Sequence, residues 1–364
     1  MRVCIPKNRS GIALIIVLLV IVVLGILAGA FAYSMKVETT LARHATFSSD
    51  LDWAGRSGAE VAKWALAQSM ASPQGPVGSF KREWGDLGAT NDILASVDLK
   101  NYHIQRINPQ GQIEEAILSI DIKDLDRKFN INVADEIILR QAMTLIGVDA
   151  AASSTIIGSI LDWRDPDSHT HLSGAESDYY EGLDPPYFAK DGPIDDLTEL
   201  LLVRGVTPAM YWGSGSGGIP TVLNRPAHGL KSAFDEPTYA VGLVDLFTPI
   251  SSRLVNMNTA SATVLQIFPD IDENVAQAII ARRAGLDGQD ETEDDTPFRS
   301  PAEIGTVPGM SPIAVQALGR YFTTRSLCFE VHISVDMRGT KREYVAILRR
   351  NGPKDIQTLN FHWK

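Results

Sequence analysis

The sequence predicts an α+β protein in which a long N-terminal helix and an antiparallel sheet carry a large, mainly helical insertion. Three observations predict this fold class. An uncharged apolar run covers residues 12–32. Two pairs of strand-like segments lie far apart, one before residue 125 and one after residue 325. The long stretch between them contains a repeated motif, and each copy of the motif is followed by helical patterns.

The apolar run predicts a membrane-spanning helix. About 20 apolar residues are needed to cross the hydrocarbon core of a bilayer, and residues 12–32 contain no charged side chain. Apolar residues then continue to recur every three or four positions, and no proline follows residue 12 until Pro73. We therefore expect one helix over residues 12–72, apolar all round in its first half and amphipathic in its second.

Basic residues precede the apolar run, namely Arg2, Lys7 and Arg9. Positive charges beside a spanning helix favour the cytoplasmic side of the membrane. The sequence therefore predicts a single-pass protein whose remaining chain lies on the far side of the cytoplasmic membrane. An ordinary N-terminal anchor is the simplest interpretation of this segment.

Alternating apolar and polar residues predict four strands, in two pairs. The second pair is joined by Met-Arg-Gly-Thr at residues 337–340, a hairpin signal. We expect residues 73–124 and 326–364 to form one sheet domain, with residues 125–325 inserted as a helical domain. The four predicted strands are residues 102–107, 116–122, 328–335 and 344–348.

The insertion contains an internal repeat. Residues 129–134 and 255–260 share an Asn-x-Asn pattern. Each copy continues with an apolar helix, an acidic helix start and a glycine turn. We therefore expect two copies of a small helical module, over about residues 129–211 and 255–322, joined by a Gly/Ser/Pro-rich stretch at residues 212–237.

Two residue types have expected roles within each copy. Asn132 and Asn258 stand where a helix N-cap is wanted. Gly205 and Gly309 stand where a tight turn between two helices is wanted.

Composition limits the partners and the source of stability. The net charge is −11, and removing three basic residues from the N-terminus would make the remainder more acidic still. Such a surface repels nucleic-acid phosphates unless a local basic face exists. The two cysteines are Cys4 and Cys328. Loss of a leader containing Cys4 would leave no intrachain disulfide, so the fold must rely on its core or on a metal.

A cluster of carboxylates is the strongest candidate for a metal site. Carboxylate oxygens suit Ca²⁺, which takes six to eight oxygen ligands. Asp165, Asp167 and Glu176 have the spacing of positions one, three and twelve of an EF-hand loop. Thr170 occupies the position at which that loop needs glycine, so this segment is not an EF-hand. The candidate ligands are Asp162, Asp165, Asp167, Glu176 and Asp178.

Other interpretations of the acidic residues remain open. The first cluster can be a solvated acidic loop without an ion. His169 and His171 allow a zinc site, although oxygen donors dominate around them. A second acidic run, residues 287–295, lacks the aromatic and glycine framework of the first cluster and is interpreted as a mobile, solvated loop.

The N-terminus resembles the cleavage site of type IV pilin-like proteins. Residues 7–11 read Lys-Asn-Arg-Ser-Gly and are followed at once by Ile12 and the apolar run. The resemblance implies that a prepilin peptidase cuts between Gly11 and Ile12, that residues 1–11 are a leader, and that Ile12 becomes the methylated N-terminus.

The chain departs from this family at the fifth residue of the expected mature chain. The family usually has glutamate there, and this chain has Ile16. The family's glutamate is thought to neutralise the terminal amine of the neighbouring subunit, which is costly to bury without a partner. A subunit with no neighbour above it does not need the carboxylate, so Ile16 predicts a place at a filament tip.

Taken with this start, the internal motifs resemble the minor pseudopilin K family of type II secretion systems over essentially the whole chain. They are the Asn-Ile-Asn repeat, Asp-Trp-Arg-Asp-Pro-Asp at residues 162–167, Gly-Ala-Glu-Ser-Asp-Tyr-Tyr at 174–180 and Gly-Leu-Val-Asp-Leu-Phe-Thr at 242–248. The resemblance implies a pilin-like sheet with an inserted helical domain, and calcium in the acidic loop. It further implies an inner-membrane anchor, a periplasmic body, and assembly with minor pseudopilins I and J at the tip of a pseudopilus.

Parts of the sequence also suggest two other function classes. Residues 307–310, Val-Pro-Gly-Met, resemble a helix-hairpin-helix turn, so the alternative is a membrane-anchored nucleic-acid-binding protein; the acidic composition argues against it. A third hypothesis is an anchored, metal-dependent hydrolase that uses the carboxylate cluster. The sequence contains no nucleophile elbow, HExxH pair or phosphate-binding loop, so we expect no enzymatic activity.

Overall fold

The computed structural model describes residues 10–70, 98–107, 113–214, 238–290, 292 and 294–364. It contains two compact units, residues 1–57 and residues 58–364. The first consists of most of the N-terminal helix. The second contains the end of that helix, the strands and the other described helices.

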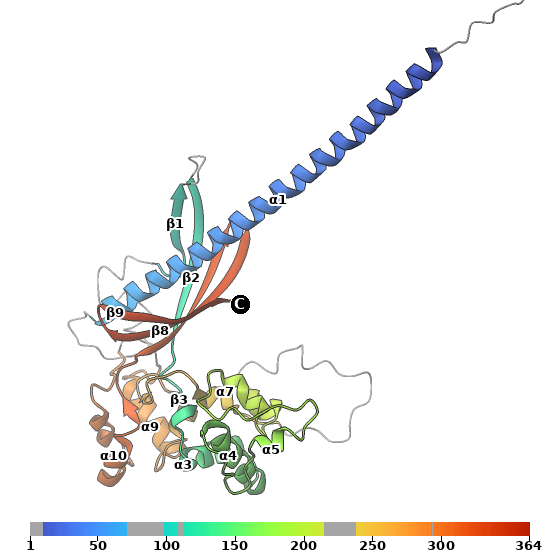
Figure 1. Ribbon diagram of the computed structural model, residues 1–364. Helices are drawn as coiled ribbons and strands as arrows, with labels where there is room; N and C mark the ends of the chain where they lie inside the picture. The colour runs from blue at the N-terminus through green and yellow to red at the C-terminus, as the bar shows by residue number, and fades with distance from the viewer. Residues whose placement is uncertain (1–9, 71–97, 108–112, 215–237, 291, 293) are drawn as a thin grey trace, which may run out of the picture. The chain divides into compact units, whose positions relative to one another are not determined.

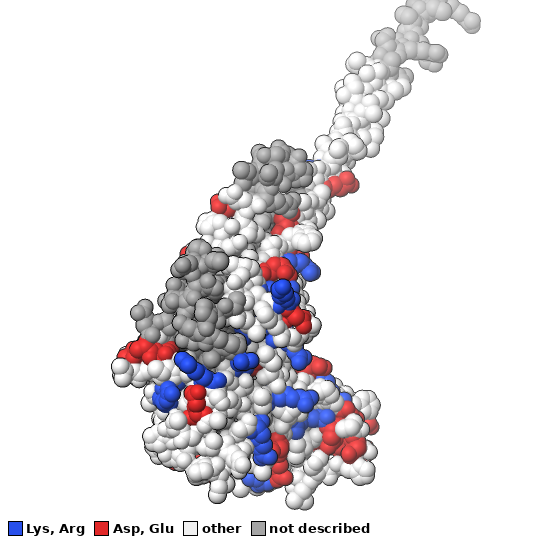
Figure 2. Space-filling view, turned by 90° about the vertical axis from the view of Figure 1, so that its left-hand side faces the viewer, with Lys and Arg blue, Asp and Glu red and all other residues white. Residues whose placement is uncertain are grey.

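The N-terminal helix, α1, runs from Ser10 to Met70, which confirms the prediction of one long helix. Among the described residues it is the one helix long and apolar enough to cross a membrane, with a mean hydropathy of 3.3 over an 18-residue window. Its apolar side chains are exposed, for example Leu14 at 70% and Phe31 at 68%. Figure 2 shows this exposed stretch in white, the colour of uncharged residues. The expected end at residue 72 and the leader up to residue 9 lie outside the described residues.

Five antiparallel strands form the sheet, in the order β1-β2-β7-β8-β9 (Figure 1). The prediction of an antiparallel sheet is confirmed, although β2 and β8 are longer than expected and β9 was missed. The turn between β7 and β8 places Arg338 and Gly339 at φ of 53° and 78°, as a two-residue hairpin requires. The strands are β1 (Tyr102–Ile107), β2 (Ile113–Asp124), β7 (Cys328–Met337), β8 (Thr340–Gly352) and β9 (Asp355–Trp363).

The end of α1 within the second unit packs on the sheet. Ala62, Ala65 and Leu66 are fully buried, which agrees with the predicted amphipathic pattern. A Cβ atom added to Gly58 would lie 2.7 Å from Ile333 Cγ2, so the absence of a side chain lets the helix approach β7 closely.

A buried arginine ties three parts of this unit together. Arg350 lies on β8 and is only 2% exposed. Its guanidinium donates hydrogen bonds to Leu66 O and Ser69 Oγ of α1 and to Ser326 O, which lies just before β7. It also lies 4.8 Å from the centre of the Phe329 ring. The cation therefore donates to one carbonyl and one hydroxyl near the C-terminal end of α1, where the helix dipole favours positive charge.

The chain between β2 and β7 forms the helical part, grouped at one end of the sheet in Figure 1. Its two copies share one apolar core, to which Phe129, Phe247, Phe268 and Phe322 contribute. The helices are η2 (Ile131–Val133), α3 (Glu136–Ile146), α4 (Ala150–Arg164), α5 (Ser177–Tyr180), η3 (Leu197–Leu202), α6 (Pro208–Trp212), α7 (Leu243–Leu246), α8 (Ala262–Leu265), α9 (Glu273–Arg283), η4 (Pro301–Thr306) and α10 (Pro312–Leu318).

Each copy begins with a short parallel strand pair. β3 (Phe129–Asn130) pairs with β4 (Phe247–Thr248), and β5 (Val255–Asn256) pairs with β6 (Phe322–Thr323). Both β3 and β5 start at the repeated Asn-x-Asn motif, and in each copy α-helices are followed by a 3₁₀ helix and a short α-helix: η3 and α6 in the first, η4 and α10 in the second. The prediction of two repeated helical modules is confirmed.

The expected capping role of the second asparagine in each motif is wrong. Asp135 caps α3 and Ser261 caps α8. Asn132 instead exchanges two hydrogen bonds with the backbone of Ile194, and Asn258 does the same with Phe298. A carboxamide presents an N–H donor and a C=O acceptor side by side, so it can pair with the N–H and C=O of one backbone residue and hold a distant segment in place.

The expected glycine turns are present. Gly205 and Gly309 have φ of 86° and 92°, the left-handed region that favours glycine. Each follows a 3₁₀ helix and precedes a short α-helix capped by a hydroxyl, Thr207 for α6 and Ser311 for α10.

Candidate metal centre

The acidic cluster lies where the loop after α4 folds back on that helix. Asp162 is in the last turn of α4 and is fully buried, and Asp165 ends the helix. Two glycines permit the close approach. A Cβ atom on Gly158 would lie 2.9 Å from Leu172 O, and a Cβ atom on Gly174 would lie 2.0 Å from Asp162 Oδ2. A larger residue at either place would push the loop away from the helix.

The loop brings four of the five predicted acids together. Ligand atoms of Asp165, Asp167 and Glu176 lie within 4.8 Å of one another. So do ligand atoms of Asp162, Asp165 and His171. The two groups share Asp165, and together they present carboxylate oxygens with one imidazole nitrogen at their edge.

Three oxygens of this cluster are buried and lack a hydrogen-bond donor among the described residues. They are Asp162 Oδ2, Asp165 Oδ1 and Glu176 Oε1. Asp162 is 0% exposed and Glu176 is 7% exposed. A buried, unpaired carboxylate oxygen is strongly unfavourable, and a hard cation is the natural partner for several that converge. The residues therefore fit an ion of the calcium type.

Electrostatics support the same interpretation. Burial, and then the charges of Asp162, Asp165, Asp191 and Asp167, raise the pKa of Glu176 to about 7. Burial, followed by the charge of Asp167, also raises the pKa of Asp165. The cluster thus disfavours its own negative charge when no cation is bound.

Two residues near the cluster were assigned no calcium-binding role from the sequence. His171 accompanies Asp162, to which its Nδ1 atom is hydrogen-bonded, and lies 3.6 Å from Asp165 Oδ2. Asp191 raises the pKa values of Asp165 and Glu176. Asp191 lies 26 residues after Asp165 in the sequence, so only the fold reveals that it acts on this cluster.

Two other candidates lie outside both groups of ligand atoms. Asp178 is exposed on α5. The side chain of His169 is 92% exposed and pairs with Asp167. The zinc hypothesis required His169 and His171 to act together, and the described geometry places only His171 beside the buried carboxylates.

Comparison of the two copies explains why their acidic runs differ. Arg164 ends α4 and donates to Ile131 O and Ala134 O. Arg283 ends α9 and donates to Met257 O and Ala260 O in the equivalent places. In the second copy, Asp290 then forms two hydrogen bonds with Arg283. The following loop therefore uses its acid to neutralise the arginine.

In the first copy, the acids that follow Arg164 converge on one another instead. Within the described residues, no equivalent of Asp290 reaches Arg164 Nε, which is buried without an acceptor. Described residues of the second acidic run also form hydrogen bonds within the run. Asp294 accepts hydrogen bonds from the backbone of Leu286 and Asp287. The acids of the first run therefore converge on one another, whereas acids of the second run form hydrogen bonds with Arg283 and with the backbone of their own loop.

The glycine turn of the first copy is directed toward the acidic loop. Arg204, next to Gly205, donates to Gly174 O and lies 4.5 Å from the centre of the Tyr179 ring. Its backbone N–H donates to Tyr180 Oη. These contacts flank Glu176 on both sides in the sequence and hold the loop against the module.

The residues implicated in processing lie at the other end of the chain. Gly11 and Ile12 are within the first turn of α1, and residues 1–9 of the expected leader are outside the described residues. Ile16 is 57% exposed on the same helix. Their proposed roles remain predictions from the sequence.

Family models match the two halves of the helical part separately. The model described as "Type II secretion system (T2SS), protein K" matches residues 119–212. The model described as "Helix-hairpin-helix motif" matches residues 251–323. The first match spans β2 and the first copy, with the acidic loop, and the second spans the second copy.

Curated relatives extend the similarity to nearly the whole chain. A type II secretion system protein K from Aeromonas hydrophila is 25% identical over 95% of this chain and 98% of its own length. The protein K of Klebsiella pneumoniae is 25% identical over 56% of this chain and 60% of its own length.

A solved structure has the same fold. It is the GspK-GspI-GspJ complex from the type 2 secretion system of enterotoxigenic Escherichia coli, in which the matched chain has a TM-score of 0.59 at 14% identity. The match covers 89% of this chain and 99% of the matched chain. The family model, the relative matched over nearly its full length and the fold agree, and together they show that this chain is similar to type II secretion system protein K.

Proposed function

We propose that this chain is the tip subunit of a type II secretion pseudopilus, where it initiates and caps the filament that drives protein export across the outer membrane. The observation that carries the proposal is the large helical part placed between β2 and β7. A filament subunit must leave room for the next subunit above it. A body of two helical modules beside the sheet fills that space, so the chain suits the end of a filament.

Ile16 supports the same position. Helices that pack in a filament core bury their N-terminal amines, and an unpaired charge there is costly. A glutamate at this position would serve the neighbour above. The chain has an isoleucine there. Both the missing carboxylate and the bulky insertion are therefore explained by the absence of a subunit above this one.

The proposed partners are minor pseudopilins I and J. The E. coli structure contains a protein K with proteins I and J, and this chain shares the fold of the matched chain. The test is purification of the tagged full-length chain in mild detergent from cells that also produce the cognate I and J proteins. We expect I and J to co-purify and the major pseudopilin to be sub-stoichiometric. Recovery of the major pseudopilin in excess, with I and J absent, would place the chain in the shaft and contradict the proposal.

Processing by a prepilin peptidase is proposed at Gly11, with Ile12 as the methylated mature N-terminus. Intact-protein mass analysis is expected to show wild-type chains starting at Ile12 with one added methyl group. Gly11→Ala should retain residues 1–11 and the inner-membrane anchor, with the body in the periplasm.

A matched glycine substitution controls for effects on the helix itself. Gly25→Ala lies in the same apolar stretch, and a Cβ atom there meets no other atom within 4 Å. We expect it to be processed normally. A Gly11→Ala chain that still starts at Ile12 would refute the proposed cleavage site.

We also propose that the acidic loop binds Ca²⁺ through Asp162, Asp165, Asp167 and Glu176. Asp178 is retained as a candidate ligand from the sequence. The converging unpaired oxygens favour this over a solvated loop, because solvated carboxylates need not be buried. The ion would supply positive charge that these carboxylates lack, and thereby hold the loop on the first module. Its test is given in the Discussion.

The alternative, nucleic-acid binding, draws support from the helix-hairpin-helix match over residues 251–323. The charge distribution argues against it. On the face seen in Figure 2, Lys and Arg alternate with Asp and Glu and form no broad basic patch. In the first copy the turn residue Arg204 is engaged with Gly174 and Tyr179. Both features favour use of the hairpins as structural joints.

A further inference from the structure

Two buried carboxylates lie where the chain leaves the sheet and returns to it. Asp124 ends β2 and is 3% exposed, and Asp126 follows two residues later at 0% exposure. The returning segment runs through Ser326 to Cys328, where β7 begins. Leu125 N–H donates to Cys328 O across this point, at 3.0 Å. The segment that leaves the sheet and the segment that returns to it therefore lie side by side.

Each carboxylate links the segment that leaves the sheet and the segment that returns to it with the second helical copy. Asp124 Oδ2 accepts from the hydroxyls of Ser326, at 2.6 Å, and Thr259. Asp126 accepts from the backbone of Ser252 and Leu327, at 2.6 Å each. Ser326 and Leu327 belong to the segment that returns to the sheet. Thr259 and Ser252 belong to the start of the second copy. Through these hydrogen bonds the two carboxylates hold the second copy to the sheet.

Within the described residues, neither carboxylate forms an ion pair. Burial, and then the charge of Asp126, raise the pKa of Asp124 to about 7, and burial raises the pKa of Asp126. The other titratable group facing them is the Cys328 thiol, whose pKa burial raises to about 12, so it stays neutral. Two adjacent carboxylates in a dry site disfavour their joint ionisation.

The Thr259 hydroxyl can keep a hydrogen bond to Asp124 when that carboxylate takes up a proton. When Asp124 is ionised, the Thr259 hydroxyl donates to it. The same hydroxyl lies 3.4 Å from Asn256 O, which offers a second acceptor. On protonation of Asp124, the Thr259 hydroxyl can turn to donate to Asn256 O while its oxygen accepts the new proton. A hydroxyl serves both arrangements because it can donate or accept. The Asn256 amide, whose Nδ2 atom lies 3.4 Å from Asp124 Oδ2, also donates to Ser326 Oγ at 2.7 Å.

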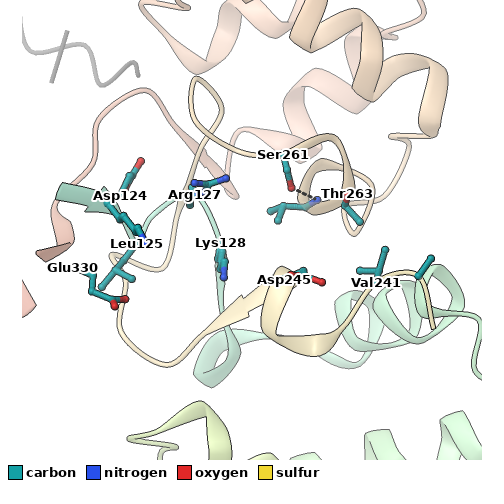
Figure 3. Close-up of a pocket in the computed structure, with 12 residues that line it drawn as sticks. Asp124, Leu125, Arg127, Lys128, Val241, Asp245, Ser261, Thr263 and Glu330 are labelled. Atoms are coloured by element: carbon teal, nitrogen blue, oxygen red, sulfur yellow. Dashed lines mark hydrogen bonds between the residues drawn. The ribbon is translucent and has the colours of Figure 1, made fainter. Parts of the chain in front are cut away.

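A cavity lies beside Asp124. Asp124 lines a cavity of about 490 Å³, with Arg127, Lys128, Asp245 and Glu330 among its other walls. Figure 3 shows these side chains around the opening, with Ser261 and Thr263 across from Asp124. Lys128 donates to Val244 O at 2.7 Å. A proton taken up by Asp124 can come from water in this cavity.

We propose that proton uptake stabilises this junction. Asp124 takes up one proton from solvent as the pH falls from about 8 to about 5.5, and the second helical copy is then held more strongly on the sheet. The folded state then binds a proton that the unfolded chain does not hold in this range, so stability rises as the pH falls and is lost as the pH rises through 7. This is the reverse of ordinary carboxylate behaviour, and it does not depend on the calcium proposal.

The experiment is urea unfolding of the detergent-solubilised full-length protein at pH 5.5 and pH 8, with calcium present throughout. From a folded pKa of about 7 and an unfolded value of 3.8, the unfolding equilibrium constant should be about 30-fold smaller at the lower pH through this group alone. Asp124→Asn should remove that factor. Asp121→Asn, at a half-exposed acid on the same strand, should retain it.

A second pair of variants answers the question if Asp124→Asn does not fold. Thr259→Ser keeps the reversible hydroxyl and should keep the wild-type pH dependence, while Thr259→Val should reduce it. In carboxyl-labelled protein, an aspartate signal that titrates near pH 7 should be absent from Asp124→Asn. A wild-type pH dependence in Asp124→Asn, or in Thr259→Val if the first variant does not fold, overturns the proposal.

Discussion

Replacing Arg350 with methionine is expected to lower the free energy of unfolding of the second unit by about 3–5 kcal/mol. The guanidinium donates to Leu66 O, Ser69 Oγ and Ser326 O, and these three hydrogen bonds would be lost from a buried site, with Leu66 O still accepting from the Ser69 hydroxyl. A buried acceptor without a donor costs about 1–3 kcal/mol. Methionine fills much of the volume, so the loss reports the hydrogen bonds more than a cavity. Urea unfolding of the detergent-solubilised full-length protein, followed by tryptophan fluorescence, measures it.

The neighbouring arginine provides the control. Arg349 lies on the same strand and is exposed. Arg349→Met is expected to change the free energy of unfolding by about 0.5 kcal/mol or less. If both variants unfold at the wild-type urea concentration, the contacts of Arg350 contribute nothing to stability, and the role given to this residue is wrong.

Calcium is expected to stabilise the wild-type protein, and Gly174→Ala is expected to abolish this effect. A ligand at 100 times its dissociation constant contributes about 2.7 kcal/mol to the folded state. A methyl group on Gly174 would lie 2.0 Å from Asp162 Oδ2, so the loop would have to leave its place over α4. Glu176→Gln should weaken the effect by removing one charged ligand. Thermal unfolding with calcium, with chelator, and with zinc in place of calcium measures these changes.

Gly182→Ala is the matched control, because its added Cβ atom would lie 3.4 Å from Tyr179 O, an ordinary contact. This variant should respond to calcium as the wild type does. Equal melting temperatures with calcium and with chelator would favour a solvated acidic loop. A response to zinc but not to calcium would favour a nitrogen-containing site at His171.

Much of the sheet could be predicted from the sequence because its pattern is local. On β7, Val331, Ile333 and Val335 are buried while His332 and Ser334 are half-exposed, which is the alternation that the sequence displays. β9 was missed because its side chains are mostly exposed on both faces, so no buried period marks it. Its place at the sheet edge follows from pairing with β8, which no local pattern encodes.

The candidate site was predictable only in part. Asp162, Asp165 and Asp167 are close in sequence, and Glu176 follows in the same loop. Their grouping could therefore be predicted. The influence of Asp191 depends on a loop that returns after more than twenty residues. Whether a nearby acid converges on the site is decided by side-chain direction, and Asp178 on α5 lies outside both groups.

The asparagine motif shows the limit of local rules. A capping preference is a statement about isolated helix ends, and it predicted caps at Asn132 and Asn258. Their partners, Ile194 and Phe298, are 62 and 40 residues away in the sequence. The repeat itself was visible, but its purpose as a cross-link between distant backbone segments became clear only when both copies made the same bonds.

The adjacency of β2 and β7 has a consequence for this architecture. Asp124 and Phe329 are register partners on neighbouring antiparallel strands, a position at which a short reverse turn would ordinarily stand. Two hundred residues can be spliced in there without altering the order or direction of any strand. The helical modules therefore interrupt the sheet only at a turn position, and a sheet with a plain hairpin at this point needs no rearrangement to accommodate them.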